Sequence, residues 1–389
     1  MALKPALPAG LPADVIPFNR ACLSGRESSY VAEAIRNGLL SGDGPFTARC
    51  HALLEEITGA RKALLTTSCT HALEMAALLL DLQPGDEVIC PSFTFVSSIN
   101  AVVLRGARPV FVDVRHDTLN IDERLIEAAI TPRTRAVLVV HYAGVACELE
   151  AIDAVAARHG LTVVEDNAHG LFGRYRGRLL GSTAPLSTLS FHETKNMTCG
   201  EGGALLINDE QFIERAEIIR EKGTNRSRFF RGQVDKYTWV DVGSSYLPSD
   251  LLAAYLLAQL EAREDVQARR HVLWQRYASE LRDWASQGDA RLPIVPEDTD
   301  HPAHLFYLLM PSLATRTALI DHMKAQHILL VFHYQPLHLS EMGRRFGGRP
   351  GQCPVTEDVA DRLVRLPLFY QLADSEQSRV VEGIRRFQP

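Results

Sequence analysis

From residue 61 onward, short runs of β-branched and other apolar residues alternate with longer stretches of helical periodicity. This alternation predicts strands at 62–66, 87–90, 108–113, 136–141 and 161–165, with helices at 70–80, 95–104, 122–129 and 148–159 between them. Strands and helices in this order form βαβ units, in which parallel strands share one sheet covered by helices on both faces. The pattern therefore predicts an α/β fold with a mostly parallel sheet, whose ligands bind beyond the carboxyl ends of the strands.

The pattern changes after residue 166. Strand-like runs at 187–191 and 204–208 flank a Gly-rich turn at 200–203, and helical periodicity returns at 210–221, 249–263 and 265–285. A loop at 291–302 precedes apolar runs at 304–310 and 329–332, a helix at 313–326 and a last helical region. We therefore expect an irregular, proline-interrupted N-terminal arm over 1–15, a large α/β domain over 16–262 and a small α+β domain over 263–389.

Composition and charge exclude several classes of protein. The longest apolar stretches, 72–80 and 136–140, are far shorter than the ~20 residues of a membrane-spanning helix, so no membrane contact is expected. The 41 basic and 47 acidic residues are mixed along the chain, so nucleic acid is not an expected partner. The seven cysteines are spread out, without a Cys-x-x-Cys pair or zinc-like spacing to histidine. We expect free thiols in a reducing cytoplasm, and no metal.

Residues 66–73, TTSCTHAL, run directly from a predicted strand into a predicted helix. The unpaired N–H groups and the positive dipole end of a helix start bind phosphate, and small hydroxyl side chains add donors. An ordinary Ser or Thr N-cap is the alternative interpretation. The density of hydroxyl groups favours a phosphate site without deciding the question.

Asp166 stands at the end of the predicted buried strand 161–165. A buried carboxylate needs a partner. The partner could be a helix start or a cation, which would make Asp166 structural. Alternatively, its charge could keep the nitrogen of a heterocyclic cofactor protonated.

Lys195 lies in the stretch 189–196, LSFHETKN, and is one of only six lysines in the chain. A Schiff base requires a lysine, which makes this short set worth examining one by one. Four of the six lysines are not expected to form a Schiff base, because they lie in the N-terminal arm, at the start of a strand, next to the end of a helix or on an amphipathic helix. Lys195 and Lys236 remain. Of these two, only Lys195 follows an apolar strand, near Ser190 and His192, where burial could lower its pKa. A solvated surface lysine is the alternative.

The hydroxyl-rich helix start at 66–73, Asp166 and Lys195 follow one another along the chain in the order found in fold-type I pyridoxal phosphate enzymes. Within that group, the chain resembles the DegT/DnrJ/EryC1/StrS sugar aminotransferases. The resemblance also rests on the motifs IPFNR at 16–20, LSGDG at 40–44, PSFTFV at 91–96, HYQPLH at 333–338 and LPL at 366–368. It covers nearly the whole chain. It implies a large domain with a mostly parallel seven-stranded sheet, a small α+β C-terminal domain and pyridoxal 5′-phosphate as cofactor.

Matching motifs also imply roles for individual residues. Lys195 would hold the cofactor as an imine, Asp166 would face its ring nitrogen, and His192 would be a further catalytic residue. His169 would lie near the phenolic oxygen, Phe95 on the ring face, and Thr70, His71 and Ser190 at the phosphate. Cys69 and Ser245 complete the expected cofactor contacts, since Ser245 stands where many relatives send an asparagine from a second subunit. The expected substrate contacts are Arg226, Arg231, Lys236, Tyr237, His333 and Tyr334.

The stretches 220–239 and 243–247 are similar to those of family members that aminate 4-keto-6-deoxyhexoses. The implied reaction transfers the amino group of L-glutamate to C4 of dTDP-4-keto-6-deoxy-D-glucose. Its products would be 2-oxoglutarate and dTDP-4-amino-4,6-dideoxy-D-galactose, a precursor of enterobacterial common antigen. A gluco product, another nucleotide sugar or a non-catalytic regulator remain alternatives. Lys195 argues against a related 3-dehydratase branch, which has histidine there.

Aromatic residues and arginines crowd the stretch 229–239. This enrichment is typical of interface cores, and it joins the family resemblance in predicting a homodimer with shared active sites. Burial of the same aromatics within their own domain is the alternative.

Overall fold

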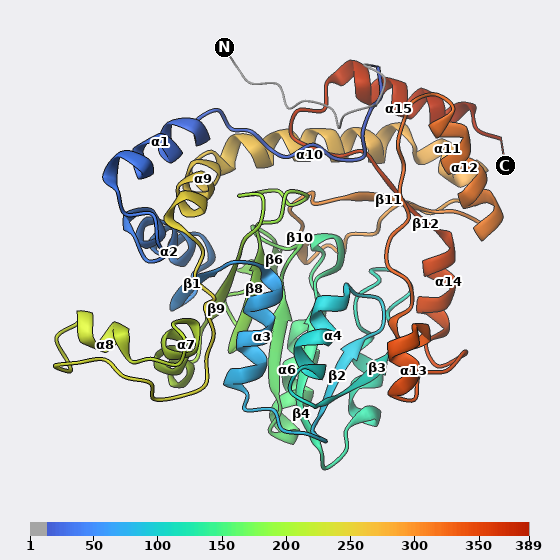
Figure 1. Ribbon diagram of the computed structural model, residues 1–389. Helices are drawn as coiled ribbons and strands as arrows, with labels where there is room; N and C mark the ends of the chain where they lie inside the picture. Colours follow the sequence, from blue (N-terminus) through green and yellow to red (C-terminus); the bar gives the residue numbers. More distant parts are fainter. Residues whose placement is uncertain (1–13, 389) are drawn as a thin grey trace.

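The computed structural model describes residues 14–388 and contains one large sheet between two layers of helices (Figure 1). The seven strands follow in the spatial order β1 (Lys62–Thr66), β9 (Gly203–Ile207), β8 (Leu186–Ser190), β5 (Thr162–Asp166), β4 (Thr134–Val140), β2 (Glu87–Pro91) and β3 (Arg108–Val112). Only β9 runs antiparallel to its neighbours. This mostly parallel, seven-stranded α/β architecture confirms the predicted fold class.

Strand β4 shows why the sheet strands read as unbroken apolar runs. Successive side chains of a strand point to opposite faces of the sheet. Val137 and Val139 enter the apolar cluster that includes Ile152 of α6 (Leu149–His159). Leu138 enters the cluster on the other face, which α3 (Cys69–Leu79) and α4 (Val96–Val103) supply. Because both faces of β4 are covered, its polar residues, Thr134 and Arg135, lie at the start of the strand.

The remaining helices and short strands surround this sheet and form the C-terminal part (Figure 1). The helices are α1 (Glu27–Asn37), α2 (Pro45–Thr58), α5 (Glu123–Ile126), α7 (Ile213–Arg220), α8 (Arg226–Phe230), α9 (Asp250–Glu261), α10 (Arg263–Glu280), α11 (Arg282–Gln287), α12 (Leu313–Lys324), α13 (Glu341–Arg345), α14 (Pro354–Arg362) and α15 (Asp374–Arg386). The short strands are β6 (Arg174–Tyr175), β7 (Arg178–Leu179), β10 (Thr299–Asp300), β11 (Phe306–Leu309) and β12 (Leu363–Leu366).

A separate apolar core lies in the C-terminal part, where α10, α12 and α15 pack against β11 and β12. Ile16 belongs to this core, and its backbone N–H donates to the His327 carbonyl at 2.8 Å. The division into a large and a small domain stays a prediction. Most of the predicted arm, residues 1–13, lies outside the described residues.

Two expectations for the C-terminal part differ from the structure. The single helix expected at 265–285 is divided into α10 and α11 at Leu281, whose φ and ψ of −97° and −3° depart from helical values. No strand forms at 329–332. This stretch makes only an isolated bridge between Val331 and Arg365 of β12, a strand that also pairs with β11.

None of the helices in residues 14–388 is both long and apolar enough to cross a membrane.

Candidate active site

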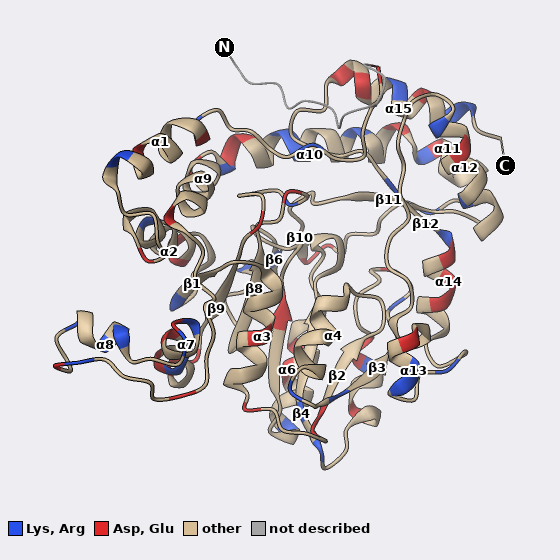
Figure 2. Ribbon diagram, viewed as in Figure 1, with Lys and Arg blue, Asp and Glu red and all other residues tan. Residues whose placement is uncertain are grey.

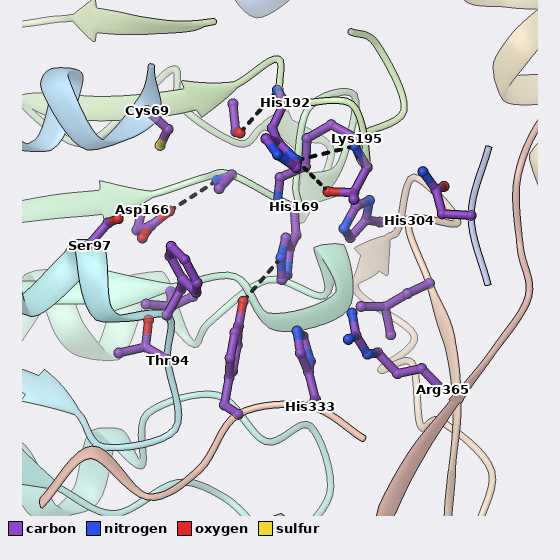
Figure 3. A pocket seen from close by; sticks show the side chains of 18 of the residues that line it. Cys69, Thr94, Ser97, Asp166, His169, His192, Lys195, His304, His333 and Arg365 are labelled. Carbon is purple, nitrogen blue, oxygen red and sulfur yellow. Dashed lines mark hydrogen bonds between the residues drawn. The ribbon is translucent and has the colours of Figure 1, made fainter. Parts of the chain in front are cut away.

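A cavity of about 760 Å³ lies at the carboxyl ends of β5 and β8, beside the start of α3 (Figure 3). The C-terminal part closes it through the loop before β11, the segment 331–334 and β12. Ten of the residues predicted as site residues line it: Cys69, Thr70, Phe95, Asp166, His169, Ser190, His192, Lys195, His333 and Tyr334. The cavity therefore brings together all three features that the sequence singled out.

Asp166 is buried at the end of β5. Its Oδ2 accepts a hydrogen bond from Ser98 Oγ at 2.6 Å, and its Oδ1 accepts one from the Ala168 N–H at 3.2 Å. In the described part of the chain, no lysine, arginine or histidine forms an ion pair with it. A buried, oriented carboxylate without a cation suits a positively charged ring nitrogen better than a structural ion pair.

Lys195 follows β8 in a tight turn, in which its backbone N–H donates to the His192 carbonyl at 2.9 Å. Within residues 14–388, its Nζ makes no hydrogen bond. Burial lowers the pKa of Lys195 to about 8, although the negative charge of Asp166 opposes that shift. A large fraction of the amine is therefore neutral near pH 8, and a neutral amine is the form that attacks a carbonyl carbon.

The start of α3 has the donors of an anion site. Ser68 Oγ accepts the His71 N–H at 3.1 Å, whereas the N–H groups of Cys69 and Thr70 have no partner in the described part of the chain. Thr70 Oγ1 bonds Ser97 Oγ at 2.7 Å. Gly203 allows this close approach, because a Cβ there would lie 2.4 Å from the Cys69 nitrogen. Free N–H groups at a helix start bind phosphate.

Aromatic rings form another wall of the cavity. The His169 ring stacks on His304 at 4.4 Å between centroids, and its Nε2 lies 3.3 Å from Tyr334 Oη. His169 Nδ1 is buried without a hydrogen-bond partner in the described part of the chain. Burial holds the pKa of His169 well below its usual range, so the ring is neutral. Phe95, at the N-cap of α4, leaves 56% of its surface exposed, enough for a ring to stack on it.

His192 is partly exposed, with 41% of its side chain accessible to solvent. Its Nδ1 lies 3.0 Å from Thr194 Oγ1, and its Nε2 lies 3.6 Å from Glu201 Oε1.

The other predicted site residues do not line the cavity of their own chain. His71 instead bonds Thr67 through Nδ1 and packs edge-on against Tyr246. Ser245 is exposed. Arg226 pairs with Glu221 at 3.0 Å, and Arg231 pairs with Glu217 at 2.8 Å.

Lys236 and Tyr237 are also exposed, in the segment after α8 that projects away from the sheet (Figure 1). Figure 2 shows the basic residues of this segment beside acidic residues of α7.

Several cavity residues were not singled out by sequence reasoning: Phe18, Asn19, Ser97, His304 and Arg365. Phe18 and Asn19 belong to the IPFNR motif, so a signal was present for them. No sequence signal pointed to His304 or Arg365 as site residues, because they lie in a loop and a strand with no unusual local composition.

The residues present fit pyridoxal 5′-phosphate. An uncompensated carboxylate, an amine that is largely neutral near pH 8, a helix start with free N–H groups and an exposed aromatic face suit its ring nitrogen, aldehyde, phosphate and ring. The described residues include no cluster of His, Cys, Asp or Glu that could hold a metal ion.

Residues 21–385 match the model of the DegT/DnrJ/EryC1/StrS aminotransferase family. The chain belongs to this family. Its spore coat polysaccharide biosynthesis relative SpsC, from Bacillus subtilis (strain 168), is 33% identical over 378 residues, covering 95% of this chain and 96% of SpsC. Pyridoxal 5′-phosphate is the cofactor of the family, so this chain is a sugar aminotransferase that uses it.

Two solved structures show how far the similarity extends. DesV of S. venezuelae, solved in complex with a ketimine intermediate, is 31% identical, with a TM-score of 0.85 over 94% of this chain and 98% of DesV. A putative sugar aminotransferase of Streptococcus pneumoniae, Spr1654 in its PLP form, is 26% identical, with a TM-score of 0.88 over 95% of this chain and 98% of Spr1654.

Proposed function

We propose that this aminotransferase carries the amino group of L-glutamate to C4 of dTDP-4-keto-6-deoxy-D-glucose, with 2-oxoglutarate and dTDP-4-amino-4,6-dideoxy-D-galactose as products. The observation that carries the aminotransferase chemistry is the meeting of Lys195, Asp166 and the α3 start in one cavity. The choice of a 4-keto-6-deoxyhexose rests on the similarity of residues 220–239 and 243–247 to those of enzymes acting on such sugars.

Each of these groups has a role in the proposed reaction. When bound, the cofactor accepts the electron pair released as a proton leaves the carbon that bears the amine. Asp166 holds a proton on the ring nitrogen, and Ser98 fixes the orientation of that carboxylate. The Lys195 amine takes the proton from one carbon and returns it to another, which its lowered pKa permits near neutral pH.

The neutral His169 ring and the His304 ring stacked on it line the same cavity. His169 contributes its unpartnered Nδ1 to the cofactor's phenolic oxygen in this proposal. Thr70 and Ser190, together with the N–H groups that begin α3, hold the phosphate.

We further propose a homodimer in which the segment 226–242 of one chain completes the cavity of the other. Exposed aromatic side chains support this proposal, since Phe230, Tyr237 and Trp239 remain 69%, 52% and 77% exposed in the isolated chain. Lys236 and Tyr237 would then reach the diphosphate of the sugar nucleotide.

A cytoplasmic location is proposed from the seven free thiols. Because SpsC is named for polysaccharide biosynthesis, we propose that the amino sugar made here is also built into a polysaccharide.

The test is incubation of the purified holoenzyme with dTDP-4-keto-6-deoxyglucose and L-glutamate, followed by NMR of the amino sugar. An axial amine at C4 is expected, and an equatorial amine would mean the gluco product. If the ketosugar is unchanged while L-glutamate alone converts the cofactor, the enzyme uses another nucleotide sugar. If neither compound changes, the chain is a non-catalytic member of the family.

A further inference from the structure

His169 presents one bonded and one unbonded ring nitrogen in the cavity. Its Nε2 lies 3.3 Å from Tyr334 Oη, a contact that the dashed line at His169 marks in Figure 3. Its Nδ1 is buried and has no hydrogen-bond partner in the described part of the chain. Because a buried polar atom without a partner costs free energy, this nitrogen points to a ligand in the cavity.

The chemistry of that free nitrogen depends on where the ring carries its proton. Burial, together with the positive charge of Lys195, holds the pKa of His169 well below its usual range, so the ring is neutral. A neutral imidazole has one proton, either on Nδ1 or on Nε2, and the partner of one nitrogen decides which of them carries it. With the proton on Nδ1, that nitrogen donates to a ligand. With the proton on Nε2, it can only accept.

The Tyr334 hydroxyl is placed to donate to Nε2 of His169. The two rings are 7° from parallel and their centroids are 6.4 Å apart, so they meet end to end rather than face to face. His333 stacks on the Tyr334 ring at 3.7 Å, and Phe93 packs edge-on against it at 5.5 Å, which fixes its position. Burial raises the pKa of Tyr334, so the hydroxyl keeps its proton. Within residues 14–388, His169 is its only hydrogen-bond partner.

His304 restricts the tilt of the same ring by stacking on one face of His169, at 4.4 Å between centroids. Asn196 holds His304 in turn. The Asn196 Nδ2 donates to the Pro302 carbonyl at 2.8 Å, and because that carbonyl can only accept, the Asn196 Oδ1 must face His304. It accepts the Nδ1–H of His304 at 2.9 Å. The direction in which His169 points its free nitrogen is therefore fixed by several contacts.

We propose that Tyr334 donates a hydrogen bond to His169 Nε2 and thereby keeps His169 in the tautomer whose Nδ1–H donates to the cofactor's phenolic oxygen. A donor at that oxygen favours its negatively charged form, whereas a lone pair on Nδ1 would repel it. Tyr334 is then a positioning residue, which acts on the cofactor through His169, rather than a substrate contact. The proposal rests on the proposed placement of His169 at the phenolic oxygen and is independent of the sugar substrate.

The test follows the absorbance of the bound cofactor against pH, in the holoenzyme without substrate. Y334F removes the hydroxyl, and H169L removes the donor to the phenolic oxygen. H169Q replaces the imidazole by an amide, whose nitrogen always carries protons and has no tautomer to select. Y307F is the matched control, because Tyr307 is buried in β11 and does not line the cavity.

In H169L, the midpoint of the absorbance change should rise by about one pH unit or more, because a charged oxygen loses its donor. Y334F should raise it by about half a unit to one unit, because only part of the His169 population then keeps its proton on Nδ1. In the H169Q background, adding Y334F should move the midpoint by less than about 0.3 unit, since the two side chains no longer couple through a tautomer. Y307F should match wild type.

NMR of the isotope-labelled histidine ring nitrogens reads the tautomer directly, with the His169 signals assigned as those absent from H169Q. The wild-type holoenzyme should carry the proton on Nδ1, and Y334F should show a mixture of both tautomers. This spectrum does not depend on activity. If a variant fails to fold, the wild-type spectrum alone decides.

A wild-type His169 with its proton on Nε2 would overturn the proposal, and so would a Y334F spectrum equal to that of wild type. Equal shifts of the midpoint by Y334F in the wild-type and H169Q backgrounds would also overturn it, because Tyr334 would then only pack against its neighbours. An unchanged midpoint in H169L would instead contradict the placement of His169 at the phenolic oxygen, and the NMR spectra would still decide the role of Tyr334.

Discussion

Lys195 owes its proposed reactivity to its surroundings. Burial lowers its pKa to about 8, so the neutral fraction of the amine should rise from pH 7 to pH 9. The rate at which the cofactor-free enzyme binds pyridoxal phosphate covalently should rise over the same range, with a midpoint near pH 8. Stopped-flow absorbance measures this rate.

Asp166→Asn supplies the control for this pH dependence. The Asp166 charge raises the pKa of Lys195, so removing that charge should move the midpoint below pH 8. A wild-type midpoint near 10.5, the ordinary value for lysine, would mean that the amine is solvated rather than shielded.

Asp166 should matter for turnover more than for folding. In Asp166→Asn, a neutral amide replaces the charge that holds the ring proton, and kcat should fall at least about 100-fold. Ser98→Ala removes only one hydrogen bond to the carboxylate, so a loss of about tenfold is expected. Circular dichroism should show both variants folded. A loss below tenfold in Asp166→Asn would make its role structural.

Among single residues, Lys195 and Asp166 could be predicted as site residues from the sequence, because each follows an apolar strand. The sequence could not predict Arg365, which is one of 35 arginines and enters the cavity only because β12 pairs with β11. Nor could it predict Ser98 as a partner of Asp166, 68 residues away along the chain. Contacts between such distant residues depend on tertiary packing, which local patterns do not encode.

The start of α3 is an element whose proposed function depends on a glycine in a neighbouring strand. A side chain at Gly203 in β9 would collide with the backbone of Ser68 and Cys69, which cannot move aside as a flexible side chain would. Gly203→Ala should therefore displace the phosphate site and weaken cofactor binding about tenfold or more. Titration of the cofactor-free enzyme with pyridoxal phosphate measures the Kd.

Gly288→Ala is the matched control, because its Cβ would meet only the Trp284 carbonyl, at 3.4 Å. Its cofactor affinity should equal that of wild type. Equal affinities in both variants would exclude α3 as the phosphate site.

The LSGDG motif at 40–44 supports the family resemblance, although its sequence does not reveal its structural role. Gly42 leaves room for Leu247, and Gly44 leaves room for the Asp250 carboxylate. That carboxylate accepts the N–H groups of Phe46 and Thr47 at 3.2 and 2.8 Å and so caps α2. The motif therefore serves the packing of α2 against α9, and the sequence alone could not separate this role from a catalytic one.

For the whole molecule, the decisive question is whether one chain completes the site of another. Lys195→Ala and Arg231→Ala should each be inactive alone. Mixed dimers should recover about a quarter of wild-type activity, because half of randomly assorted dimers contain one site without either lesion. A homodimer in which both chains carry both substitutions should stay inactive. A monomer in sedimentation analysis, or verified mixed dimers without activity, would refute shared sites.

The central claim, that Lys195 holds the cofactor in this cavity, is tested most directly by borohydride reduction of the holoenzyme followed by peptide mass spectrometry. The account predicts that the added mass lies on the peptide containing Lys195, and that Lys195→Ala binds the cofactor without any covalent addition. Attachment to Lys236, or to any other lysine, would contradict it.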